Sequence, residues 1–177
     1  MKDSVRIAKA TQADVNAIRS LLLTSLFDLY AGATADKHLI TWLRASTSAE
    51  SIRACISGTE WTLLTAVDRR GRVVGTGRIN DLGYVSNIAA ATPNVGIGGT
   101  ILDSLVHGAE ASPWMSVWSG NVAMLALASS RGFAPVSTDP DERYLPDLRF
   151  QILHLIIGQA QPAALRPAPR LHLARAA

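Results

Sequence analysis

Residues 94–102 read Asn-Val-Gly-Ile-Gly-Gly-Thr-Ile-Leu, and they lie between two runs of different hydrophobic period. The preceding run, 84–90, is strand-like, whereas the following run repeats apolar residues at helical spacing as far as Ala109. A glycine-rich turn between a strand and a helix leaves backbone N–H groups unpaired at the positive end of the helix dipole. The stretch therefore predicts a seat for a phosphate, with a merely tight turn as the structural alternative.

Two common phosphate-binding motifs do not fit these glycines. The dinucleotide pattern G-x-G-x-x-G needs a third glycine at position 101, where the chain has Ile101. A Walker loop needs a Lys-Ser/Thr pair after the glycines, and no such pair follows them. Another class of phosphate-bearing ligand is therefore expected.

Upstream of the turn, periodicity predicts a strand, three helices and then two strands joined by a hairpin turn at 68–71. Thr11 and Asp14 form an acidic variant of a capping box at the start of the first helix. Gly75 and Gly77 lie inside a predicted strand and indicate a bulge or a close approach by another segment. The expected ranges are, in order, 5–8, 11–26, 34–43, 48–58, 61–67 and 72–79.

Downstream of the glycine-rich turn and its helix, we expect a strand, a short helix ending at Gly132, a polar loop and a final apolar strand. One more strand near Pro135 is an alternative to the start of that loop. The expected ranges are 114–118, 121–130, 135–146 and 148–157. Residues 158–177 form an expected flexible tail, because they are rich in Ala, Pro and Arg and have no period.

This order predicts an α/β (α+β) fold in which a mixed, mostly antiparallel central sheet has helices on both faces. The apolar residues make up 48% of the 177 positions, which is enough for one globular domain. The net charge of +3 comes from the tail, so no basic face for nucleic acid is expected. Isolated histidines suggest no metal site. The single Cys55, expected as an inert core thiol, and the lack of a long apolar run favour a cytoplasmic protein outside the membrane.

Two segments give this chain a resemblance to the GNAT superfamily of N-acetyltransferases, covering about residues 4–157. The first, 93–98, reads Pro-Asn-Val-Gly-Ile-Gly and is similar to the family's acyl-CoA loop, Gln/Arg-x-x-Gly-x-Gly/Ala. The second, 121–133, begins with Asn121 and ends in Gly132-Phe133, like the family's second motif. The resemblance implies a GNAT-like domain at 1–157, followed by the tail.

By this resemblance the ligand is acetyl-CoA or another acyl-CoA, with no metal. The pyrophosphate is expected on the backbone of the glycine-rich turn, and the pantetheine arm along the preceding strand, with the thioester near Asn87 and Ser119. Asn121 is weighed equally as a ligand contact and as a helix cap. The expected cofactor-binding residues are Ile88, Ala89, Ala90, Val95, Gly96, Ile97, Gly98, Gly99, Thr100 and Asn121.

The sequence departs from the family pattern at three positions. Pro93 replaces the usual Arg or Gln of the loop, which removes a side-chain contact to the phosphates. Ala128 stands where many members have the tyrosine that protonates the thiolate, and Leu82 stands where some carry the catalytic base. Asp81 and Tyr84 remain as the candidate catalytic residues, with a water chain as the alternative base.

The resemblance implies transfer of an acyl group from acyl-CoA to a primary amine by direct attack. The alternative is a GNAT-like domain that binds CoA or a partner with little or no turnover, because Pro93 and Ala128 lack the usual side chains. A plain interaction domain is a third interpretation. The amine acceptor is not identified; Phe27, Tyr30 and Trp42 are weighed as its lining, with core packing favoured. A homodimer through the terminal strand is one further expectation.

Overall fold

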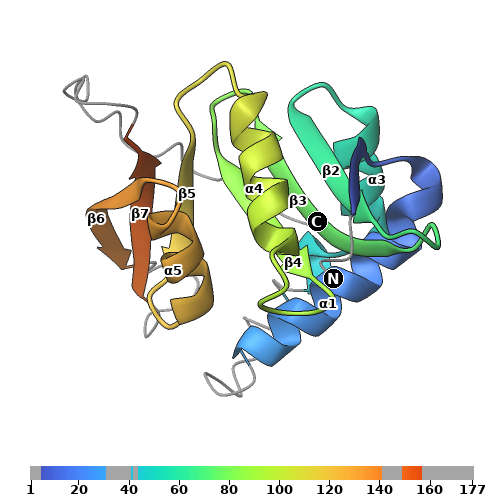
Figure 1. Cartoon of the computed structure of the whole chain (residues 1–177), viewed down its shortest axis with the longest axis horizontal. Helices are drawn as coiled ribbons and strands as arrows, with labels where there is room; N and C mark the ends of the chain where they lie inside the picture. Colours follow the sequence, from blue (N-terminus) through green and yellow to red (C-terminus); the bar gives the residue numbers. More distant parts are fainter. Residues whose placement is uncertain (1–4, 31–40, 42–43, 141–148, 157–177) are drawn as a thin grey trace.

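The computed structural model describes residues 5–30, 41, 44–140 and 149–156. The predicted helix at 34–43 and the predicted tail lie outside the described residues, apart from position 41. The other helices and strands follow one another largely in the order predicted from the hydrophobic periods (Figure 1). They are β1 (Arg6–Lys9), η1 (Gln12–Asp14), α1 (Val15–Tyr30), α3 (Ala49–Ser57), β2 (Trp61–Val67), β3 (Val73–Asn80), β4 (Val85–Ala90), α4 (Ile97–His107), β5 (Trp114–Trp118), α5 (Val122–Ser129), β6 (Phe133–Pro140) and β7 (Arg149–Leu155).

The first sheet has four antiparallel strands in the order β1-β2-β3-β4. The predicted hairpin between β2 and β3 is confirmed, since the Asp68 carbonyl accepts from the Gly71 N–H at 3.0 Å. The second sheet has three antiparallel strands in the order β5-β7-β6. The mostly antiparallel architecture predicted from the sequence is therefore correct, but the strands form two sheets.

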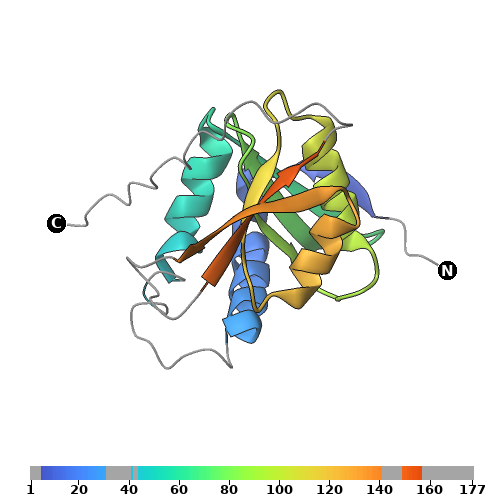
Figure 2. The same cartoon turned by 90° about the vertical axis from the view of Figure 1, so that its left-hand side faces the viewer.

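Helices cover both faces of the four-stranded sheet, as predicted. Figure 2 shows α4 and α5 on one side of the strands and α1 and α3 on the other. The core under α4 joins both sheets, because it contains residues from β2, β4, β5, β6 and β7. The core under α1 and α3 is smaller and includes the free, buried thiol of Cys55, in agreement with the core role expected for it.

The two glycines in β3 explain how closely α4 approaches the sheet. A Cβ built on Gly75 would lie 2.5 Å from Ile97 Cγ2, and one on Gly77 would lie 2.6 Å from Ile101 Cγ2. Opposite Gly77, the register of β4 shifts between the Thr76 and Arg78 pairings. Both predicted alternatives are thus present: β3 has an extra residue next to Gly75, where its register with β2 shifts between Ala66 and Val67, and α4 makes the close approach.

The loop predicted at 135–146 is wrong over residues 135–140, because β6 continues through this stretch and pairs with β7. β6 is the edge strand of its sheet, and its register shifts between Pro135 and Ser137. An edge position and a bulge both tolerate the missing N–H of proline, so the polar, proline-bearing sequence remains compatible with a strand. The alternative of a strand near Pro135 is confirmed.

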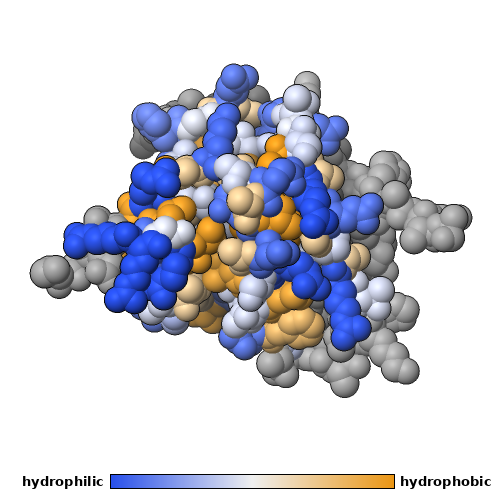
Figure 3. Space-filling model, turned by 90° about the vertical axis from the view of Figure 1, so that its right-hand side faces the viewer, coloured by the Kyte–Doolittle hydropathy of each residue, from blue (hydrophilic) through white to orange (hydrophobic). Residues whose placement is uncertain are grey.

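On the face at the β1 edge, apolar residues show between hydrophilic ones (Figure 3). Such scattered apolar surface is ordinary on folded proteins. Within the described ranges, no helix is long and apolar enough to cross a bilayer.

Candidate functional site

The glycine-rich stretch forms the loop between β4 and α4, as the sequence predicts. Gly96 is the N-cap residue of α4 and has φ of +90°, a left-handed conformation that favours glycine. Asn94 is also left-handed, with φ of +63°, which asparagine tolerates better than most residues. The loop therefore turns sharply and leads the chain directly into the helix.

The first turn of α4 presents backbone donors at its open end. The Thr100 N–H donates to the Gly96 carbonyl at 3.0 Å, and the Thr100 hydroxyl donates to the same oxygen at 3.2 Å. The amides of Ile97, Gly98 and Gly99 precede this first helical hydrogen bond, at the positive end of the helix dipole. Thr100, expected in the cradle, has its own N–H paired inside the helix.

Beside this helix end, β4 and β5 lie next to each other but diverge. They are joined by an isolated parallel bridge between Tyr84 and Trp114, after which β4 remains paired with β3 and β5 with β7. Among the described residues, the outer edge of β4 from Ile88 to Ala90 has no strand partner. Backbone groups at such an edge can pair with an extended ligand. The bulge in β4 includes Asn87, which has φ of +55°.

Arg131 reaches from the end of α5 to the first turn of α4. Its Nε donates to Asp103 Oδ1 at 3.2 Å, and its Nη1 donates to Ser130 Oγ at 2.9 Å. The guanidinium lies against Gly99, so closely that it would have to shift if position 99 carried a Cβ. The helix end thus carries a cationic side chain in addition to its backbone donors.

Sequence reasoning missed Arg131. Its only local signal is a basic residue before the Gly132-Phe133 pair, and the contact joins segments 28 positions apart. The second expected motif does form the short helix α5, capped by Asn121, whose Oδ1 accepts from the Met124 N–H at 3.1 Å. Leu127 of this helix lies 3.5 Å from where a Cβ of Gly98 would be. Leu127 of α5 therefore lies in ordinary van der Waals range of the first turn of α4.

The two candidate catalytic residues occupy different environments. Asp81 is exposed in the turn between β3 and β4, and its N–H donates to the Glu60 carbonyl at 3.2 Å. The Tyr84 ring packs against Trp114, with centroids 4.4 Å apart. Burial raises the pKa of Tyr84 above its ordinary value, although nearby Arg78 lowers it. Tyr84 is therefore protonated at neutral pH, so it suits an acid and not a base.

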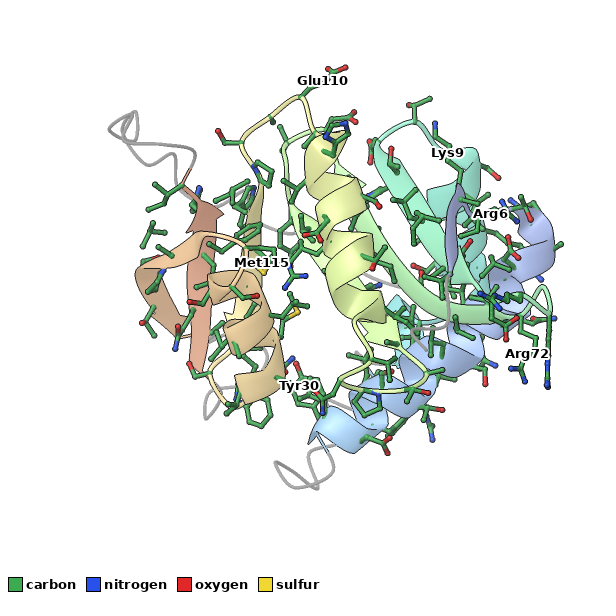
Figure 4. The ribbon with its side chains drawn as sticks, viewed as in Figure 1. Arg6, Lys9, Tyr30, Arg72, Glu110 and Met115 are labelled. Atoms are coloured by element: carbon green, nitrogen blue, oxygen red, sulfur yellow. The ribbon has the colours of Figure 1, made fainter. Side chains whose placement is uncertain are left out.

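A second tyrosine lies where β4 and β5 diverge. Tyr30, at the end of α1 (Figure 4), is buried, and its ring centroid lies 5.3 Å from that of Trp118 at the end of β5. Burial raises the pKa of Tyr30 to about 12, with a further contribution from nearby Tyr84. Ala128, by contrast, is fully buried in the core. Tyr30 and Tyr84 are therefore two tyrosines near the ends of β4 and β5, whereas position 128 has none.

The described part of the chain contains no group of three or more His, Cys, Asp and Glu side chains that could hold a metal ion. The side chains and backbone groups near the α4 end are instead those of an anion site: N–H donors, a guanidinium and an open strand edge.

No protein-family model and no curated protein matches the sequence. Solved structures do match. The PaiA N-acetyltransferase from Thermoplasma acidophilum, in complex with coenzyme A, has a TM-score of 0.70 at 15% identity, covering 85% of this chain and 98% of that one. A GCN5-related N-acetyltransferase from Rhodopseudomonas palustris gives 0.69 at 16% identity, over 87% and 96%. Ribosomal-protein-alanine N-acetyltransferase from Brucella melitensis gives 0.58 at 20% identity, over 86% and 99%.

These similarities cover nearly the whole length of each matched structure. They establish that this chain has the fold of the GNAT N-acetyltransferases, as the sequence resemblance implied.

Proposed function

We propose that this protein is an N-acyltransferase that uses acetyl-CoA, or another acyl-CoA, to acylate a primary amine. The observation that carries the proposal is the open edge of β4 beside the glycine-rich end of α4. The proposed domain spans residues 1–157, with the tail outside it. A cytoplasmic location is part of the proposal, because free Cys55 suits a reducing compartment.

In this proposal the pyrophosphate of CoA lies at the end of α4. The N–H groups of Val95, Ile97, Gly98 and Gly99 are its backbone donors, while Gly96 supplies the left-handed turn. Arg131 adds a guanidinium, which binds phosphate oxygens more strongly than a neutral donor does. This side chain compensates for Pro93, which has replaced the usual basic or amide residue of the loop.

The pantetheine arm, an extended chain with amide groups, would pair with the backbone of Ile88, Ala89 and Ala90. This pairing uses the edge of β4 that lacks a strand partner among the described residues. The thioester would then lie in the region between Asn87 and the end of β5. Asn121 contributes by fixing the start of α5, since its side chain caps that helix.

The reaction is attack of a neutral amine on the thioester carbonyl, which forms a C–N bond and breaks the C–S bond. The amine loses a proton and the departing thiolate gains one, so the overall reaction needs no external acid or base. Tyr30 and Tyr84, both protonated at neutral pH, are the proposed proton donors to the thiolate. Asp81, or water held near it, is the proposed acceptor of the amine proton.

The alternative function is binding of CoA without turnover. The fully buried methyl group of Ala128 favours it, because no hydroxyl at that position can protonate the thiolate. Release of free CoA from acetyl-CoA, measured with a panel of primary amines, separates the two functions. The transferase proposal predicts amine-dependent thiol release, whereas binding in calorimetry without any release would support the alternative. Absence of binding at millimolar acetyl-CoA would exclude both.

A further inference from the structure

A second polar site lies on the α3 side of the sheet, away from α4. It is a cavity of about 410 Å³, within the size range of small-molecule pockets. Its walls come from α3, the following loop, the start of β2 and the end of β3. The lining residues are Ser51, Ala54, Cys55, Gly58, Thr59, Glu60, Trp61 and Arg78.

Arg78 is held in this cavity by three contacts, one of which is a side-chain hydrogen bond with Cys55. Its guanidinium carbon lies 4.2 Å from the centroid of the Trp61 ring, and its Nε donates to Ser86 Oγ at 2.9 Å. Stacking and fixed hydrogen bonds orient a guanidinium, so less freedom is lost when its remaining N–H groups bind a ligand. Beyond the hydrogen bonds to Ser86 and Cys55, the guanidinium retains N–H donors for a planar acceptor.

The positive charge of Arg78 has no anionic partner among the described residues, where no ion pair joins it to a carboxylate. The adjacent Cys55 does not supply one. Burial raises the pKa of the Cys55 thiol, and this effect outweighs the opposing effect of Arg78. The thiol is therefore neutral at physiological pH, and the guanidinium faces the cavity without a counter-charge.

One carboxylate lines the same cavity, at a separate position. Glu60 is exposed and makes no ion pair with Arg78. Its main chain is fixed, because the Glu60 carbonyl accepts from the Asp81 N–H at 3.2 Å. The hydroxyl-bearing residues Ser51 and Thr59 complete the polar lining. The cavity thus offers the cation of Arg78 on β3 and the carboxylate of Glu60 on the α3–β2 loop. The hydroxyl groups of Ser51 and Thr59 are further polar groups in its lining.

We propose that this cavity binds a zwitterionic α-amino acid, with its carboxylate on Arg78 and its ammonium group toward Glu60. A planar carboxylate matches the fork of a guanidinium, and an ammonium group complements the acid at the rim. The proposal goes beyond acyl transfer and does not depend on it, since binding is measured without CoA.

The test is an NMR titration of the ¹⁵N-labelled protein with each of the common L-amino acids, followed at the Trp61 indole and Arg78 Nε–H signals. Concentrations up to about 10 mM detect affinities in the millimolar range. We expect at least one amino acid to shift both signals in a saturable way. The corresponding amino-acid amide, which lacks the carboxylate, should bind at least about tenfold more weakly.

Three variants sharpen this test. Arg78→Gln should weaken binding at least about tenfold, because the charge-assisted hydrogen bonds are lost. Arg53→Gln is the matched control, because Arg53 is an exposed residue of α3 that does not line the cavity, and it should leave the affinity unchanged. Glu60→Gln should weaken binding of the amino acid by a few-fold, because the ammonium group loses its acidic partner. It should leave unchanged the binding of the matching carboxylic acid that lacks the α-amino group.

Glu60→Gln also keeps the proposal testable if Arg78→Gln fails to fold, since Glu60 is exposed. The proposal is overturned if no amino acid shifts the two signals. Equal affinity for the amide and the acid overturns it as well, and so does an unchanged affinity in Arg78→Gln or in Glu60→Gln. Loss of CoA binding would bear on the acyltransferase proposal alone.

Discussion

At the scale of single residues, the position of Arg131 is the most informative. Cations stabilise the C-terminal ends of helices, where the helix dipole is negative, yet Arg131 lies against the N-terminal turn of α4. Asp103 offsets part of this repulsion, but that pair is largely exposed and stabilises little. A site that concentrates positive potential in this way is suited to a bound anion, in agreement with the proposed pyrophosphate position.

We therefore expect Arg131→Gln to raise the Kd for acetyl-CoA about three- to tenfold, as measured by calorimetry, because one charge-assisted contact is lost at a partly exposed position. Asp103→Asn should lower the Kd, since it removes a competing carboxylate. Arg72→Gln is the control: Arg72 pairs with Asp68 on the β2–β3 hairpin, far from α5 in Figure 4. An unchanged Kd in Arg131→Gln would remove Arg131 from the site.

Tyr30 gives a prediction about pH at the same scale. Its pKa is about 12 in the folded protein and near the ordinary tyrosine value of 10.0 in the unfolded chain. Between these values the unfolded chain loses a proton that the folded chain keeps, so the free energy of unfolding should fall as the pH rises from 10 toward 12. Tyr30→Phe should show a shallower fall in urea denaturation series across this range. An equally steep fall in Tyr30→Phe would contradict the buried position of its hydroxyl.

At the scale of elements, the packing of α4 on β3 sets the position of the glycine-rich end. Ile101 is fully buried between the helix and Gly77, with Ile88 and Leu105 as the other neighbours of that glycine. Without side chains on Gly75 and Gly77, the helix lies closer to the sheet than larger residues would allow. The helix end is therefore positioned by the strand beneath it as well as by its own loop.

Gly77→Ala should lower the free energy of unfolding by about 1–3 kcal/mol, because the added methyl group overpacks a buried contact. Gly108→Ala is the matched control. A Cβ at Gly108 would have only the Ser104 carbonyl oxygen nearby, at 3.7 Å, so its effect should stay within about 0.5 kcal/mol. Urea denaturation of both variants measures the difference. Equal stabilities would show that α4 can move away from β3 at little cost.

The elements also show where sequence reasoning succeeds and where it stops. The sequence predicts β2 with its observed bounds, 61–67, because a run of apolar and β-branched residues ends at a clear turn. It predicts mainly a loop where β6 lies, because an edge strand needs neither an unbroken apolar pattern nor every N–H. The glycine-rich turn before α4 follows from local spacing alone. Tyr30 is expected mainly as a core residue, and its buried position agrees with that role. Arg131 and the Arg78 cavity are not predicted, since each depends on contacts between distant segments.

At the scale of the whole molecule, a continuous core supports an open strand edge. The core under α4 joins the four-stranded and three-stranded sheets. Both β4 and β5, the two strands that diverge, are therefore held in place by buried contacts. Among the described residues, the packing of the fold therefore leaves the edge of β4 from Ile88 to Ala90 without a strand partner. A strand edge left unpaired in this way needs little rearrangement to accept an extended ligand, which lowers the cost of binding.

The central claim is that CoA lies along this edge with its pyrophosphate at the end of α4. The most direct measurement is backbone amide hydrogen exchange, followed residue by residue by NMR with and without saturating CoA. We predict slower exchange for Ile97, Gly98 and Gly99 and along 88–90, with no change in the hairpin at 68–71. Binding of CoA without slower exchange at these amides, or with protection confined to other segments, would contradict the account.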